Sequence, residues 1–165
     1  MPAPAFIHLR LHSEYSIVDG IVRLDDAVDR ARADGMPALA LTDLANLFGL
    51  VKFYEAARAN GIKPIIGCDV WVANDSNRDQ PFRLLLLVAN SRGYRQLCEL
   101  LSRAYRTNMH RGKALLQRDW LRETEGLIAL SGGASGDIGA ALLQDNTSLA
   151  ARCAHAWISD FPGRF

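Results

Sequence analysis

The sequence predicts an α/β fold with mostly parallel strands. Short apolar runs rich in β-branched residues alternate with segments of helical periodicity, and glycines close two of the helical segments. Polar residues such as Asp43 and Asp69 stand at or near the ends of predicted strands, where α/β sheets and barrels build their functional sites. Residues 160–165 resemble a loop leading into a further strand, so we expect a fragment of an unfinished barrel or sheet.

The first half of the chain is expected to contain three strands and two helices. In order they are a strand over 6–11, a helix over 21–34, a strand over 37–43, a helix over 47–61 and a strand over 62–72. The first helix carries aspartates early and arginines late, as the helix dipole favours, and Gly35 ends it. Its predicted apolar face consists of Ile21, Leu24, Val28 and Ala31.

The second half continues the alternation after a polar loop over 74–80. We expect a buried strand over 82–90, a helix over 91–106, a basic loop over 108–113, a strand over 126–133, and helices over 135–144 and 147–160. Ser135 with Asp137 opens the first of these last two helices, and Thr147 or Ser148 opens the second. The apolar residues of the helix over 91–106 are Tyr94, Leu97, Cys98, Leu101, Ala104 and Tyr105.

Composition excludes several classes of protein. The 165 residues are 49% hydrophobic and 22% charged, which is typical of a soluble globular domain, and a net charge of +1 argues against binding polyanions through bulk charge. The longest apolar run, 84–89, is too short to span a bilayer, and the amino terminus lacks the pattern of a secretory signal. The three cysteines have neither zinc-finger nor disulfide spacing, which predicts reduced thiols in a cytoplasmic protein.

The segment FIHLRLHSEYSIVDG, residues 6–20, contains the first candidate site. If it is a strand, His8, Arg10 and His12 share one face, and Asp19 follows closely. Histidines and a carboxylate indicate a metal site, although such a group is more often structural. Arg10 argues against a metal, because guanidinium is always charged and has no lone pair to donate.

Three further motifs are weaker. Asp43 and Asn46 in LTDLANLFG are also ordinary turn and helix-cap residues, and that role is the more frequent one. Asp69 in GCDVWV stands among apolar residues, where a carboxylate needs a partner. The glycine turn in LSGGASGDIG could cradle phosphate, but a capped helix start is favoured. Two histidines have no ligand-like neighbours and are interpreted as surface or structural: His110 and His155.

Taken in order, four segments resemble the PHP (polymerase and histidinol phosphatase) domain found at the start of bacterial DNA polymerase III alpha subunits. They are FIHLRLHSEYSIVDG, MPALALTDLANLFGLVKFYEAARANGIKPIIGCDVWV, LLLLVANSRGYRQLCELLSRAY and EGLIALSGG with GDIG. The resemblance implies a distorted (β/α)7 barrel, usually longer than this chain. Metal-binding members hold a cluster of zinc, iron or manganese and hydrolyse phosphoesters, in some polymerases as a 3′–5′ exonuclease. Other members are inactive, and a separate epsilon subunit docked on them proofreads.

Residue by residue, the first two family motifs are only partly kept. Where metal-binding members have His-x-His-x-His, this chain has His8, Arg10 and His12, and the later Asp19 matches. Where they have Thr-Asp-His, Asp43 is followed by Leu44, which cannot coordinate a metal.

The later motifs depart in the same direction. Asp69 stands in place of a glutamate, Arg83 in what we take to be a histidine position, and Gly133 in place of a cysteine. We therefore expect a vestigial site without metal, in which Arg10 pairs with some of the aspartates in place of the lost cations. The candidate partners of Arg10 are Asp19, Asp43 and Asp69; an alternative use of the pocket is phosphate binding by Arg10, His12 and Arg83.

The leading hypothesis is a PHP-domain fragment, residues 1–165, of a replicative DNA polymerase III alpha subunit. The resemblance implies a parent that is a Mg²⁺-dependent nucleotidyltransferase, with this fragment a non-catalytic, cofactor-free scaffold. Its expected partners are the rest of the alpha subunit and the epsilon exonuclease, with DNA bound through the parent chain and no membrane association. The rival hypothesis is an active phosphoesterase, pyrophosphatase or 3′–5′ exonuclease using Zn, Mn or Fe. Its ligands would be His12, Asp19, Asp43 and Asp69.

Overall fold

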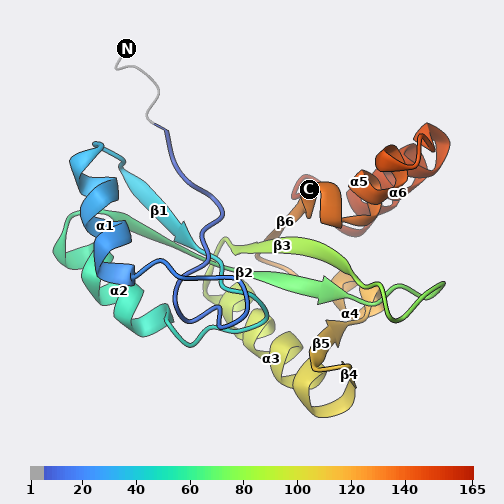
Figure 1. The fold of residues 1–165 in the computed structure, drawn as a ribbon, viewed down its shortest axis with the longest axis horizontal. Helices are drawn as coiled ribbons and strands as arrows, with labels where there is room; N and C mark the ends of the chain where they lie inside the picture. Colours follow the sequence, from blue (N-terminus) through green and yellow to red (C-terminus); the bar gives the residue numbers. More distant parts are fainter. Residues whose placement is uncertain (1–5) are drawn as a thin grey trace. The chain divides into compact units, whose positions relative to one another are not determined.

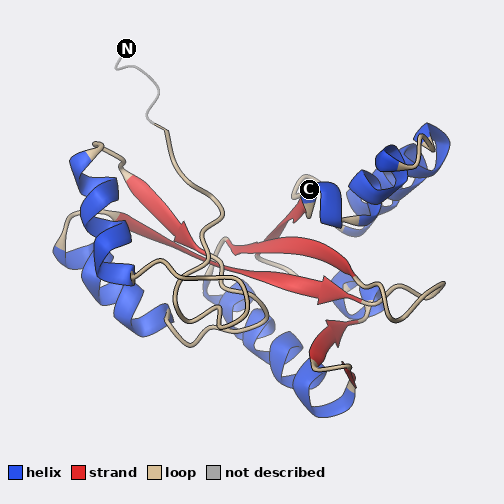
Figure 2. Ribbon diagram, in the orientation of Figure 1, coloured by secondary structure: helices blue, strands red, loops and turns tan. Residues whose placement is uncertain are grey.

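The computed structural model describes residues 6–165 (Figure 1). These form two compact units, one that ends at Cys68 and one from Asp69 to Phe165, and β2 contributes to both. Both units combine strands with helices (Figure 2), so the predicted α/β class is confirmed. The prediction that no secretory signal is present rests partly on residues 1–5, which lie outside the described residues.

The first unit is built from α1 (Leu24–Ala33), β1 (Ala38–Leu41), α2 (Leu50–Ala59) and the start of β2 (Lys63–Val72). β1 and β2 pair in parallel, with Ala38 opposite Lys63 and Leu41 opposite Ile66. Both helices contact β1 and pack on each other, because their apolar faces need burial that an isolated helix cannot supply. The buried cluster between them consists of Leu24, Val28, Ala31, Leu39, Leu41, Phe53, Ala57 and Ile62.

One residue of the predicted helical face lies elsewhere. Ile21 is 92% exposed and precedes α1, whose N-cap is Arg23. Val22 instead forms a parallel bridge with Ser13, so the chain is extended just before the helix begins. The rest of the predicted face is buried, and Gly35 follows the helix with a φ of 67°, as a helix-ending glycine requires.

The prediction of a strand over residues 6–11 is wrong. The segment runs beside β1 and accepts two backbone hydrogen bonds, from Ala40 N–H to the His8 carbonyl (3.0 Å) and from Thr42 N–H to the Leu11 carbonyl (2.9 Å). The donors are two residues apart and the acceptors three, so this segment contains one extra residue, as in a β-bulge. The chain bends at Leu9, and the alternation of side chains that a regular strand would impose is lost.

The second unit contains both kinds of strand pairing. β3 (Phe82–Val88) pairs antiparallel with β6 (Leu127–Ser131), from Leu84 opposite Ser131 to Val88 opposite Leu127. The end of β2 pairs in parallel with β5 (Lys113–Leu116). The expectation of mostly parallel strands is therefore only partly right. After β3 the chain continues into α3 (Ser91–Thr107). It later returns to the end of β3, where the first residue of β6, Leu127, pairs with Val88.

A β-hairpin and a short helix of this unit were not predicted. The expected loop over 108–113 contains a hairpin, formed by β4 (Met109–His110) and β5, which pair antiparallel. Its turn residues, Arg111 and Gly112, have φ angles of 47° and 75°, the combination found in tight hairpin turns. The short helix α4 (Arg118–Arg122) follows.

The last two helices form where the sequence predicted them, but the first has Gly136 as its N-cap, so the prediction that Ser135 opens it is wrong. They are α5 (Asp137–Leu143), which follows the short 3₁₀ helix η1 (Gly133–Ser135), and α6 (Thr147–Asp160). The N-cap of α6 is Asn146, which accepts a hydrogen bond from Leu149 N–H, rather than Thr147 or Ser148. Of the apolar residues predicted for α3, Leu97, Leu101 and Ala104 are buried, whereas Tyr94 and Tyr105 are exposed.

The structure bears on membrane-spanning helices and on disulfides. Among residues 6–165, no helix has the length and apolarity needed to cross a bilayer. Cys68, Cys98 and Cys153 form no disulfide in the part of the chain that the structure describes.

Candidate functional site

Asp43, just after β1, is the most deeply buried carboxylate of the first unit. Its side chain is 1% exposed, and Ser13 engages both of its oxygens. The backbone N–H of Ser13 donates to Oδ1 at 2.6 Å, and the Ser13 hydroxyl donates to Oδ2 at 2.9 Å. Asp43 is thus satisfied by the segment that carries the first motif.

Local backbone pairing puts Ser13 opposite Asp43. Leu11 N–H donates to the Thr42 hydroxyl at 2.9 Å, and Thr42 N–H donates to the Leu11 carbonyl, which fixes the two segments just before Ser13 and Asp43. The following loop then folds back tightly. A Cβ atom at Gly20 would lie 1.9 Å from the Ser13 carbonyl oxygen, so a larger residue would push Ser13 away from Asp43.

The predicted neighbours His12 and Asp19 do meet. His12 Nδ1 lies 2.9 Å from Asp19 Oδ1, and the Ser16 hydroxyl donates to the same oxygen at 2.7 Å. Ser16 Oγ also accepts the backbone N–H of Leu44 at 2.8 Å, which ties this loop to the residue after Asp43. Neither Ser13 nor Ser16 was predicted as a site residue, because isolated serines in a loop carry no distinctive sequence signal.

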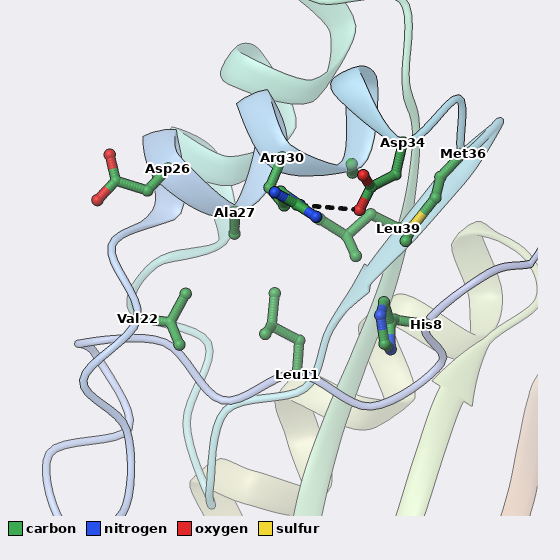
Figure 3. Close-up of a pocket in the computed structure, with 10 residues that line it drawn as sticks. His8, Leu11, Val22, Asp26, Ala27, Arg30, Asp34, Met36 and Leu39 are labelled. Carbon is green, nitrogen blue, oxygen red and sulfur yellow. Dashed lines mark hydrogen bonds and ion pairs between the residues drawn. The ribbon is translucent and has the colours of Figure 1, made fainter.

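His8 lines a cavity of about 260 Å³ between the amino-terminal segment and α1 (Figure 3). Leu11 lines the same cavity, although strand alternation would place it on the face opposite His8. The extra residue between them accounts for this. The prediction that His8, Arg10 and His12 share one face by alternation therefore rested on a strand that does not form.

In the second unit, Asp69 is clamped by Arg83. The guanidinium donates from Nε to Oδ1 at 3.0 Å and from Nη2 to Oδ2 at 2.8 Å, with Asp69 1% and Arg83 8% exposed. The guanidinium carbon also lies 4.5 Å from the centroid of the Trp71 ring, a cation–π contact. The sequence expectation that Asp69 needs a partner is confirmed.

Gly133 begins η1 with a φ of 58°, a conformation that strains any residue with a Cβ. The preceding Gly132 is held against β3, since a Cβ there would lie 2.1 Å from the Arg83 carbonyl oxygen. A cysteine at position 133, as in metal-binding PHP domains, would be strained in this turn.

The carboxylates of Asp43 and Asp69 already have protein partners in this structure. Both oxygens of Asp43 accept hydrogen bonds from Ser13, and both oxygens of Asp69 are bound to a cationic side chain. Within residues 6–165, no three His, Cys, Asp or Glu side chains group so as to hold a metal ion. The pairing of Arg10 with Asp19, Asp43 or Asp69, and phosphate binding by Arg10, His12 and Arg83, stay predictions.

Burial raises the pKa of the Asp43 carboxyl above its ordinary value, and the Ser13 hydrogen bonds and the nearby His12 only partly oppose this. A raised pKa means that the folded protein holds this proton more tightly than the unfolded chain. Its contribution to stability is therefore present below the unfolded pKa and is lost as pH rises through the folded pKa.

Replacing Asp43 with asparagine should remove this pH dependence. The amide keeps an oxygen for Ser13 N–H and can donate to the Ser13 hydroxyl. Urea unfolding between about pH 3 and about pH 7 should show the wild type losing stability relative to Asp43→Asn as pH rises. The exposed Asp75→Asn serves as control. A difference that stays constant or changes in the opposite direction would contradict the assignment.

Comparisons with known proteins agree with these motifs. The chain matches the PHP domain family over residues 8–165. It is 46% identical to DNA polymerase III subunit alpha of Escherichia coli K12 over 166 aligned residues, which cover 100% of this chain and 14% of that protein. The corresponding subunit of Pseudomonas aeruginosa is 45% identical, covering 98% of this chain and 14% of that protein.

Among solved structures, one similar chain is an amidohydrolase from Chromobacterium violaceum, determined with bound sulfate and no metal. It is 28% identical with a TM-score of 0.48, covering 61% of this chain and 33% of that one. The family match covers nearly the whole sequence and includes every candidate site residue, from His8 to Gly133. The chain belongs to the PHP domain family.

Proposed function

We propose that this chain is the PHP-domain portion of a bacterial replicative DNA polymerase III alpha subunit, and that it acts as a metal-free, non-catalytic scaffold. Residues 1–165 would be the amino-terminal part of that domain. The chain spans 14% of the length of the E. coli relative, so the activity and partners of a whole polymerase enter only as part of this proposal.

The observation that carries the proposal is the clamp of Arg83 on Asp69. A divalent cation and a guanidinium compete for one buried carboxylate, because the two cations repel each other at that distance. Arg83 makes two hydrogen bonds to Asp69 in a nearly water-free position. The positive charge that a metal would bring is already supplied by a side chain.

Three other positions support loss of the metal. Leu44 offers no donor atom from its side chain, and Gly133 occupies a backbone conformation that disfavours a cysteine. Arg10 places a fixed charge within the first motif. Counted with Arg83, four ligand positions of metal-binding members are changed, and at two of them the new residue is an arginine, as expected when side chains take over the role of metal ions.

The parent polymerase would carry out Mg²⁺-dependent nucleotidyl transfer with residues outside this chain, in the cytoplasm. Within it the PHP portion would pack on the rest of the alpha subunit and provide a docking surface for the epsilon exonuclease, while DNA is bound by the parent. The near-neutral net charge of +1 favours a role in protein contacts, because a domain that binds DNA by itself usually has a basic excess. Titration of the chain with purified epsilon subunit, followed by calorimetry, tests the docking role.

Elemental analysis tests the absence of metal. The chain, purified without chelators from medium supplemented with zinc, manganese and iron, should contain far less than one equivalent of each. A metal-binding PHP phosphoesterase prepared in parallel serves as the positive control. One or more retained equivalents, together with phosphodiester hydrolysis that disappears in His12→Ala, would replace this proposal with the metal-dependent phosphoesterase hypothesis.

A further inference from the structure

Five large apolar side chains of the first unit are open to solvent, on two segments that contact each other. Ile17, Val18 and Ile21 belong to the loop before α1, and Phe48 and Val51 flank the start of α2. Each of the five is at least 67% exposed. We call these residues the apolar patch. Large exposed apolar groups of this kind mark surfaces that bind another protein.

Direct contacts hold the two segments of the apolar patch together. Asn46 Nδ2 donates to the Tyr15 carbonyl at 3.1 Å, and a Cβ atom at Gly49 would lie 2.9 Å from the Tyr15 ring. Lys52 Nζ lies 3.9 Å from a carboxylate oxygen of Glu14, so α2 is also linked to the loop by an ion pair. The loop residues and the α2 residues of the patch therefore occupy one region of the first unit.

The loop that carries three of the patch residues is fastened at several points. Glu14 N–H donates to the Val22 carbonyl at 2.8 Å, which closes the loop, and Asp19 N–H donates to the Ser16 carbonyl at 3.0 Å within it. The tight fit of Gly20 against the loop backbone adds a steric restraint. Side chains presented by a fixed loop lose little conformational entropy when a partner binds them, which favours binding.

Charge limits what can cover the apolar patch. The segments that carry it contain more exposed acids than bases, namely Glu14, Asp25, Asp26 and Glu55 against Arg23 and Lys52. This excess disfavours DNA, because the phosphates would be repelled. It also disfavours a twofold contact with a second copy, which would bring the same acids against one another. A protein segment that combines aliphatic and basic side chains fits best.

We propose that the apolar patch docks another part of the alpha subunit, a segment that presents aliphatic side chains flanked by lysine or arginine. This inference rests on the proposed function, in which the chain is one portion of a longer polymerase. The aligned residues cover only 14% of the E. coli relative, so most of such a polymerase lies outside this chain. A segment of the same polypeptide has a high effective concentration, and a modest apolar surface is then enough to hold it.

Photo-crosslinking in the full-length polymerase identifies what covers the patch. The photoreactive residue p-benzoylphenylalanine, placed at Val18, should cross-link to a segment of the same chain outside residues 1–165. Mass spectrometry of the cross-linked peptide should show lysine or arginine in that segment. The same group placed at Asp75, exposed in the loop between β2 and β3, is the control and should give a much lower yield.

The double variant Ile17→Asp with Ile21→Asp shows whether the apolar surface holds the contact. Both side chains are exposed, so the 165-residue chain should keep its wild-type urea unfolding. In the full-length polymerase, hydrogen exchange of the amides of residues 14–22 should become about tenfold faster and reach the rate of the 165-residue chain. Leu143→Asp, at an exposed apolar position on α5, is the matched control and should leave that exchange rate unchanged.

The proposal is overturned if Val18 cross-links only to the epsilon subunit or to a second polymerase, or no more than Asp75 does. It is also overturned if residues 14–22 exchange equally fast in the full-length polymerase and in the 165-residue chain. Elemental analysis separates this result from that of the proposed function. A metal-free PHP portion without the cross-link loses only the docking surface, whereas a cross-linked one that retains metal keeps the docking surface and contradicts the metal-free scaffold.

Discussion

Arg83→Met is expected to lower the free energy of unfolding by about 3–5 kcal/mol. The substitution keeps much of the apolar volume of the side chain but removes the guanidinium that donates two hydrogen bonds to Asp69. Asp69 is 1% exposed, so water cannot replace those donors without local opening. The cation–π contact with Trp71 is lost as well. Urea unfolding at neutral pH measures the effect.

The double variant Asp69→Leu with Arg83→Met shows whether charge is the cause. Replacing a buried ion pair by apolar side chains of similar size is often neutral or stabilising, so the double variant should regain most of the loss. Arg92 and Glu125 form an exposed ion pair in the same unit, and Arg92→Met should change stability by no more than about 1 kcal/mol. A double variant as unstable as Arg83→Met would show that packing, and not the charge left on Asp69, dominates.

The Asp69–Arg83 pair also shows what sequence alone can predict. An aspartate among apolar strand residues signals that a partner exists, because an unpaired buried carboxylate is too costly. The identity of the partner does not follow from local pattern, since Arg83 is fourteen positions away and carries no signal of its own beyond the family resemblance. Long-range pairings of this kind depend on how strands are brought together.

The amino-terminal segment shows the opposite case, in which a correct local pattern gives a wrong geometry. Apolar and polar residues alternate from Ile7 to His12, but one extra residue between the hydrogen bonds of His8 and Leu11 breaks the alternation in the structure. His12 nevertheless meets Asp19, because the loop of residues 13–22 returns to it. That Ser13 is the partner of Asp43 could not be predicted from the sequence, because it depends on how the two segments pair.

Helices were predicted better than strand connections, for a physical reason. Their apolar periodicity and glycine ends are local, as in α1 and α2, and the structure keeps both. The hairpin of β4 and β5 was missed because its turn uses Arg111, a residue without a strong turn preference, in a left-handed conformation. Its two-residue strand is also too short to show alternation.

Gly93→Ala is the second substitution for which we expect a large effect, a loss of about 3 kcal/mol in the free energy of unfolding. Gly93 lies in the first turn of α3, where a Cβ would be 1.9 Å from the carbonyl oxygen of Gly126. That oxygen is not free to move, because it accepts a 2.8 Å hydrogen bond from Ala89 N–H at the end of β3. Backbone must therefore shift on one side of the contact.

The side chain of Asn90 makes the junction still tighter. It accepts the Gly93 N–H as the N-cap of α3, and it lies against Gly126, where a Cβ would be 2.2 Å from Asn90 Oδ1. Any movement of α3 that relieves the clash therefore weakens the cap, so the two costs add. Ser102→Ala, at an exposed position of the same helix, should change stability by less than about 0.5 kcal/mol. If Gly93→Ala in urea unfolding matched that control, the close contact between α3 and the turn before β6 would not exist in solution.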